Sequence, residues 1–323
     1  MNTAVQTALE RLVQSYREGS LSRRGFFQRL AFLTGSVVAA KEIMVVEGFA
    51  REYEAYDWTE VSPALAPAQA PGQAPQQPTP KESIAAGEKR LPGAARAEWV
   101  KYKSGEAEVG AYLARPKTGA PFAAIIVIHE NRGLTEFVLD IAQRWAGVGL
   151  LAVAPDCLSR LGGTANFESM DAARQGIGRL VRADVVADLH ASVAYLKTRD
   201  DVRKNRIGMC GFCWGGGQTW NFATESGELA FAVPFYGPPP PLERLEKISC
   251  PVFGVFAESD QFVNQNLDAV EAKLKELGKN FTRRMFPGTQ HAFMNFTSPQ
   301  RYNEEQAKAA WAEVTAFVKK MIG

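Results

Sequence analysis

The sequence predicts an α/β fold with a mostly parallel central sheet and helices on both faces. Two observations support this prediction. Short apolar runs typical of buried strands alternate along the chain with longer stretches typical of helices. The composition is that of a globular protein, with 46% apolar and 22% charged residues among 323. Alternation of this kind is typical of a parallel sheet that is covered on both faces.

The expected strands begin near residue 123 and continue to the last part of the chain. They are residues 123–128, 151–156, 206–210, 231–237, 251–256 and 283–286. Helices are expected between or after these strands, at residues 136–148, 184–198, 267–277 and 304–321. We expect one domain over residues 95–323, because roughly 230 residues is an ordinary size for a single α/β domain.

One turn in this pattern carries a candidate nucleophile. The strand at residues 206–210 runs into Gly211 to Gly215, which read G-F-C-W-G, the motif G-x-S-x-G with Cys213 in the place of serine. A nucleophile at such a strand-to-helix turn has an unfavourable backbone conformation, and the flanking glycines give the turn its room. The turn aims the backbone N–H of Trp214 at a bound carbonyl oxygen. The alternative is a glycine-rich turn with a buried structural cysteine.

Two further strand ends supply an acid and a base. Asp260 follows the strand at 251–256 and His291 follows the strand at 283–286, and the order nucleophile, acid, histidine is that of the α/β-hydrolases. Only a few per cent of an ordinary thiol is ionised at neutral pH, so Cys213 needs a base within reach. We expect His291 to be this base and Asp260 to fix its tautomer. Glu258 is an alternative acid, and Asp260 is alternatively a helix N-cap.

These segments together resemble the dienelactone hydrolase family, which are cysteine hydrolases of the α/β-hydrolase fold. The resemblance extends from about residue 99 to the C-terminus. It implies that Glu130, in H-E-N-R-G-L after the strand at 123–128, holds or takes the thiol proton in the resting enzyme. It also implies that the backbone N–H of Asn131 is a second oxyanion donor beside that of Trp214. The implied substrate is a small ester or lactone, cleaved through a thioester without a cofactor.

One position departs from this resemblance. Dienelactone hydrolase holds the carboxylate of its substrate with arginines, one of them four residues beyond the catalytic histidine, where this chain has Asn295. Dienelactone itself is therefore not established as the substrate by the resemblance. Three arginines precede the nucleophile in a helical stretch, Arg174, Arg179 and Arg182, and we assign them to a solvated helix face.

Two other functions fit parts of the pattern. Cys210 and Cys213 form C-x-x-C, the spacing of thiol-disulfide oxidoreductases, although redox motifs open a helix at the first cysteine and Cys210 belongs to a strand. A non-catalytic binding protein of the same fold is the second alternative. The histidines are scattered, at His129, His190 and His291, so no metal is expected. With a net charge of +2, nucleic acid is not an expected partner.

The N-terminal part contains a candidate export signal. Arg23 and Arg24, within S-R-R-G-F-F, precede an apolar run at residues 30–40, which is shorter than the about 20 residues of a membrane-spanning helix. This pattern is typical of a twin-arginine signal. We predict a signal at residues 1–40, recognition by the twin-arginine export machinery, and a periplasmic or extracellular location. The alternative is a cytoplasmic protein with an interaction helix before a chance Arg-Arg pair.

Residues 41–94 are expected to form an extension. Residues 62–80 within it consist mainly of proline, alanine and glutamine and carry no charge. Such a tract cannot bury a core and is typical of an extended linker. If the signal stays uncleaved, this linker is predicted to act as a membrane tether.

Overall fold

The computed structural model describes residues 12–16, 18, 26 and 77–323. The chain divides into two compact units, Met1–Gln76 and Gln77–Gly323. In the first unit residues 12–16 are helical, and the rings of Tyr16 and Phe26 stack with centroids 4.3 Å apart. The predicted arginine pair, the apolar run and most of the predicted linker lie outside the described residues.

The second unit starts with a helix inside the segment expected to form an extension. Helix α5 (Pro80–Glu88) begins with a capping box, in which Thr79 and Glu82 each accept a hydrogen bond from the other's backbone N–H. The Ser83 hydroxyl accepts from the backbone N–H of Glu136 at 3.0 Å, which joins α5 to the next helix. The compact unit therefore extends upstream of residue 95.

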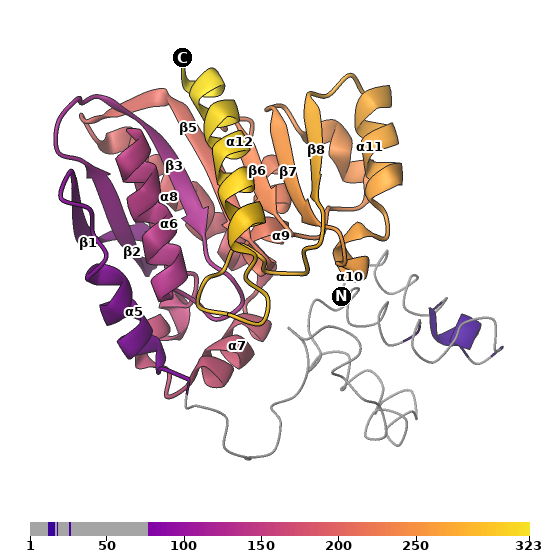
Figure 1. Ribbon diagram of the computed structural model, residues 1–323, viewed down its shortest axis with the longest axis horizontal. Helices are drawn as coiled ribbons and strands as arrows, with labels where there is room; N and C mark the ends of the chain where they lie inside the picture. Colours follow the sequence, from indigo (N-terminus) through magenta and orange to yellow (C-terminus); the bar gives the residue numbers. More distant parts are fainter. Residues whose placement is uncertain (1–11, 17, 19–25, 27–76) are drawn as a thin grey trace. The chain divides into compact units, whose positions relative to one another are not determined.

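Eight strands form one mixed sheet in the order β1-β2-β4-β3-β5-β6-β7-β8 (Figure 1). Their bounds are β1 Ala95–Ser104, β2 Ala107–Pro116, β3 Phe122–Ile128, β4 Leu151–Pro155, β5 Val202–Phe212, β6 Ala232–Phe235, β7 Val252–Ala257 and β8 Phe281–Phe286. The pairs β1–β2 and β2–β4 are antiparallel and all the other pairs are parallel. The prediction of an α/β fold with a mostly parallel sheet is confirmed.

Helices cover both faces of this sheet. Helix α5, α6 (Glu136–Val148) and α12 (Glu304–Ile322) pack on one face, whereas α8 (Arg182–Thr198), α9 (Trp214–Ala223) and α11 (Leu267–Glu276) pack on the other. Strand β3 serves both cores, because Ile125 and Val127 belong to the first and Ile126 and Ile128 to the second. Two short helices, α7 (Met170–Gly178) and α10 (Gln261–Asn264), lie in the connections.

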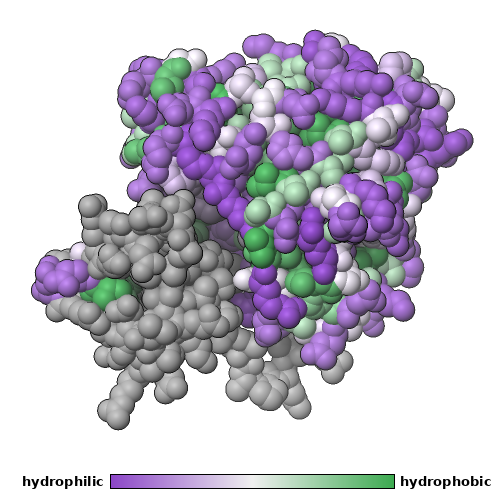
Figure 2. All heavy atoms as spheres, turned by 180° about the vertical axis from the view of Figure 1, so that it is seen from behind, coloured by the Kyte–Doolittle hydropathy of each residue, from purple (hydrophilic) through white to green (hydrophobic). Residues whose placement is uncertain are grey.

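One face of the second unit is mainly polar (Figure 2). On the face shown in Figure 2, hydrophilic residues cover most of the described surface and apolar residues form small groups. No helix in the described part of the chain combines the length and the apolar character that crossing a membrane requires.

Candidate active site

Cys213 stands at a sharp turn between β5 and α9. Its backbone has φ 57° and ψ −116°, a conformation that costs free energy for a residue with a side chain. The turn is tight: a Cβ on Gly211 would lie 2.2 Å from the carbonyl oxygen of Gly215, and one on Gly215 would lie 2.4 Å from that of His129. Both motif positions therefore require glycine. The Cys213 side chain is partly exposed, as attack on a substrate requires.

His291 and Asp260 are brought together from two loops beyond the strands. His291 Nδ1 lies 2.5 Å from Asp260 Oδ2, while the other oxygen, Oδ1, accepts from the backbone N–H of Val263 at 3.4 Å and caps α10. The two predicted roles of Asp260, orienting His291 and capping a helix, thus use different carboxylate oxygens. The alternative acid, Glu258, instead accepts from the backbone N–H of Gly288 at 2.8 Å. The structure places Asp260, and not Glu258, against His291.

The surroundings of His291 favour its protonated form. Burial by itself lowers the pKa of the ring, but the electrostatic influence of Cys213 together with the hydrogen bond and charge of Asp260 outweighs burial and raises this pKa well above its ordinary value. Nδ1 faces Asp260, so Nε2 is the nitrogen available to the thiol. Nε2 is buried without a hydrogen bond of good geometry in this conformation, although Cys213 is close enough to influence the charge of the ring. Such bonds commonly tighten only when substrate is present.

Glu130 follows β3 and is held by a residue far away in the sequence. Its Oε2 accepts from the side-chain amide of Asn295 at 2.6 Å, and the amide oxygen of Asn295 accepts from the Thr297 backbone N–H at 2.9 Å. Burial raises the pKa of Glu130, and the Asn295 hydrogen bond and the charge of His291 oppose this shift without cancelling it. Oε1 is buried without a partner among the described residues. The carboxyl group is therefore suited to carrying a proton.

Backbone strain gathers around these residues. Among the described residues other than glycine, positive φ angles occur at Cys213 (57°), Tyr236 (36°) and Ala292 (68°). Ala292 directly follows His291, and the buried ring of Tyr236 packs edge-on against His291 with centroids 5.2 Å apart. Residues held in such conformations concentrate at functional sites. Nothing in the sequence around Tyr236 signals its conformation.

The loop after β4 ties down the segment that carries Glu130. Asp156 Oδ1 accepts from the Thr164 hydroxyl at 2.7 Å, and Asp156 Oδ2 accepts from the Thr164 backbone N–H at 2.6 Å. The hydroxyl oxygen of Thr164 in turn accepts from the backbone N–H of Leu134 at 3.1 Å. Thr164 and Leu134 are fully buried, so these bonds are shielded from water and hold residues 130–134 in place.

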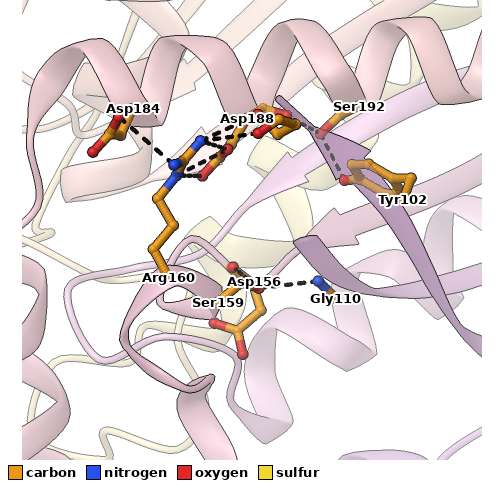
Figure 3. A network of polar contacts seen from close by, with 9 residues as sticks. Tyr102, Gly110, Asp156, Ser159, Arg160, Asp184, Asp188 and Ser192 are labelled. Carbon is orange, nitrogen blue, oxygen red and sulfur yellow. Dashed lines mark hydrogen bonds and ion pairs between the residues drawn. The ribbon is translucent and has the colours of Figure 1, made fainter. Parts of the chain in front are cut away.

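A second polar network anchors this loop to the rest of the unit (Figure 3). The Arg160 guanidinium lies 2.8 Å from the Asp188 carboxylate of α8, and the Ser192 hydroxyl of α8 lies 2.7 Å from the Tyr102 hydroxyl of β1. Ser159 Oγ accepts from the backbone N–H of Gly110 in β2 at 3.0 Å. The loop after β4 is thus joined to β2 and α8, and α8 is in turn joined to β1.

All four cysteines are free thiols, and Cys213 is the one that is not buried. Burial raises the pKa of Cys157 and Cys210 far above the ordinary value and that of Cys250 to about 12. Cys210 is therefore a poor source of the thiolate that redox exchange with Cys213 would need. Within the described residues, no three side chains of His, Cys, Asp or Glu are grouped as a metal site.

The strand order and the strained turn between β5 and α9 define an α/β-hydrolase. Residues 109–322 match the dienelactone hydrolase family, and the chain belongs to this family. Protein usf of Aquifex pyrophilus is similar, with 31% identity over 70% of this chain and 99% of its own length. A Methylorubrum extorquens protein provisionally named carboxymethylenebutenolidase is 29% identical over 68% of this chain and 80% of its own.

A solved structure supports the same assignment. The crystal structure of a provisionally named dienelactone hydrolase from Klebsiella pneumoniae superposes with a TM-score of 0.64 and 26% sequence identity, covering 70% of this chain and 99% of that one. The predicted α/β-hydrolase fold is confirmed, as is the predicted enzyme class, a hydrolase acting on ester bonds.

Proposed function

We propose that this protein hydrolyses carboxylic esters or lactones with Cys213 as the nucleophile, through a thioester intermediate. The observation that carries the proposal is the position of Cys213 at the strained turn, next to a histidine that is itself paired with Asp260 at 2.5 Å. A partly exposed thiol with a base and an orienting carboxylate is the arrangement that nucleophilic acyl transfer requires.

In the proposed reaction His291 takes up the proton that the Cys213 thiol loses, and the sulfur attacks the carbonyl carbon while the carbonyl electron pair moves to oxygen. The backbone N–H groups of Trp214 and Asn131 are proposed to stabilise this oxyanion. Its collapse re-forms the carbonyl and breaks the bond to the alkoxide, which takes a proton from His291. A water molecule then gives a proton to His291 and attacks the thioester, which releases the acid and the Cys213 thiolate.

Glu130 and Asn295 shape the substrate preference in this proposal. Glu130, whose pKa is raised by burial, is proposed to hold the thiol proton in the resting enzyme. Asn295 donates its amide to Glu130 and adds no positive charge. We therefore propose that uncharged esters and lactones are better substrates than lactones with a free carboxylate.

The test is turnover of p-nitrophenyl acetate by the wild type, Cys213→Ala and the matched control Cys210→Ala. Cys213→Ala is expected to lower kcat/KM by about 10³-fold or more, because the nucleophile is lost. Cys210→Ala, which truncates a thiol that is fully buried in β5, is expected to leave kcat/KM within about threefold while lowering stability. Equal activity of Cys213→Ala and the wild type would contradict the proposal.

We also propose export by the twin-arginine route, from the sequence around Arg23 and Arg24. The test is cell fractionation of the full chain and of a variant with both arginines changed to lysine. Export predicts that the wild type is in the periplasm or the medium and that the variant stays in the cytoplasm. A cytoplasmic wild type would instead support the alternative location.

A further inference from the structure

A buried histidine that no step of the proposed reaction uses lies beside the catalytic loop. His129 follows β3 directly and is fully buried. Its Nε2 accepts from the backbone N–H of Cys157 at 3.1 Å. Its Nδ1 lies 2.7 Å from the backbone carbonyl oxygen of Glu130. Both ring nitrogens are therefore engaged with the backbone of two different loops.

These two contacts fix the tautomer of His129. A backbone N–H only donates, so the nitrogen that faces Cys157, Nε2, carries no proton. A ring with an unprotonated Nε2 is neutral, and burial favours this form because it lowers the pKa of His129, against the opposing effect of Asp156. A neutral ring without a proton on Nε2 has it on Nδ1, and Nδ1–H donates to the carbonyl of Glu130.

The carbonyl that His129 holds belongs to the peptide group that carries one of the proposed oxyanion donors. The C=O of Glu130 and the N–H of Asn131 are the two ends of one planar peptide bond. A hydrogen bond that fixes the oxygen therefore fixes the direction of the Asn131 N–H. It also polarises the peptide and makes this N–H a stronger donor.

His129 contacts the second donor segment as well. Its ring stacks on the indole of Trp214, with centroids 5.4 Å apart and planes 15° from parallel. Its backbone oxygen lies against Gly215, where a Cβ would come within 2.4 Å. One residue thus contacts both segments that contribute the proposed oxyanion donors.

We propose that His129 is the positioning residue of the oxyanion hole, holding the peptide of Asn131 and the ring of Trp214 in the geometry that acylation needs. This inference rests on the proposed function, because it concerns the acylation of Cys213. Removal of an oxyanion donor costs about 10²- to 10³-fold in kcat. Misdirection of one donor is expected to cost somewhat less, about 10- to 100-fold.

The test compares two reactions of the same sulfur in the full-length protein. Acylation of Cys213 by p-nitrophenyl acetate passes through an oxyanion. Alkylation by iodoacetamide does not, since the sulfur forms a bond to a saturated carbon as iodide leaves with the electron pair of the C–I bond. His129→Phe keeps an aromatic ring against Trp214 but has no ring nitrogen. His129→Asn keeps a donor close to the Nδ1 position.

We expect His129→Phe to slow acylation about 10- to 100-fold and to leave the alkylation rate within about threefold. His129→Asn should recover part of the acylation rate. A purely structural role would slow both reactions together, and that result would overturn the inference. Unchanged acylation in a folded His129→Phe would overturn it too. If the wild type itself is not acylated at Cys213, the proposed function fails and takes this inference with it.

A second measurement needs no variant. In ¹⁵N NMR of the wild-type histidine rings, His129 is expected to show a protonated Nδ1 and an unprotonated Nε2 that do not titrate between about pH 5 and 8. A proton on Nε2, or a ring that gains charge in this range, would overturn the inference even if His129→Phe does not fold.

Discussion

The substitution Asp260→Asn separates the two tasks of the Asp260 carboxylate. In the wild type Oδ2 faces His291 Nδ1 at 2.5 Å and Oδ1 accepts from the backbone N–H of Val263 at 3.4 Å. Asparagine has one acceptor and one donor at this position, so it cannot accept both bonds. If its oxygen keeps the helix cap, its NH₂ group faces His291 and drives the proton of the ring to Nε2. A ring in this tautomer cannot take a proton from the thiol.

The expected effect on activity is large and the effect on stability is small. Loss of the correct tautomer in a triad costs about 10³- to 10⁴-fold in kcat/KM, or about 4 to 5.5 kcal/mol in the transition state. Loss of the cap instead would cost about 1 kcal/mol of folding free energy. In either orientation the negative charge beside His291 disappears, so one cause of its raised pKa is removed.

The assay is kcat/KM for p-nitrophenyl acetate, with urea unfolding as the measure of stability. Glu258→Gln is the matched control, because Glu258 accepts from the backbone N–H of Gly288 and a glutamine oxygen can still accept this bond. The control should retain activity within about threefold, since it adds no donor against His291. Activity of Asp260→Asn above a tenth of the wild type, or an equal loss in Glu258→Gln, would refute the reasoning.

Two further substitutions test the turn and the buried acid. Gly211→Ala should lower the free energy of unfolding by about 1–3 kcal/mol or more, because its Cβ would lie 2.2 Å from a backbone oxygen. Gly147→Ala in α6 is the control, because its Cβ would have open space, and it should raise the free energy of unfolding by about 0.5–1 kcal/mol. Equal effects of the two substitutions in urea unfolding would contradict the close approach at Gly211. Glu130→Gln should remove a pH dependence of the free energy of unfolding. The folded state raises the pKa of Glu130 above its ordinary 4.5, so the contribution of Glu130 to wild-type stability is fully present below pH 4.5. This contribution is lost as pH rises through the raised pKa, by at most about 1.4 kcal/mol per pH unit. The stability of Glu130→Gln relative to the wild type should therefore grow as pH rises above 4.5, and a difference that stays constant would argue against a raised pKa.

The parts of the fold that sequence patterns predicted have strong local signals. Helix α6 occupies residues 136–148 as expected, because Thr135 stands at its start and Gly149, with φ 106°, ends it. The carboxyl ends of parallel strands meet at one edge of a sheet, so Cys213, Asp260 and His291 were expected to be close. The structure places His291 against Asp260 and brings Cys213 near them.

Other parts depend on contacts that no local pattern encodes. Strand β1 is a partly exposed edge strand, so it contains no apolar run that would reveal it. The bond between Asn295 and Glu130 joins residues 165 positions apart, and its existence depends on how two loops meet. The same holds for His129, which sequence spacing presented only as an isolated histidine, and for the conformation of Tyr236.

The most direct test of the central claim is mass spectrometry of the acyl-enzyme. The wild type is mixed with p-nitrophenyl acetate, quenched in acid within one turnover and digested. We predict one acetyl group on Cys213 and none on Cys157, Cys210 or Cys250, which are buried and serve as internal controls. Continued release of p-nitrophenol with no adduct on Cys213, or with an adduct on another residue, would contradict the proposed cysteine mechanism.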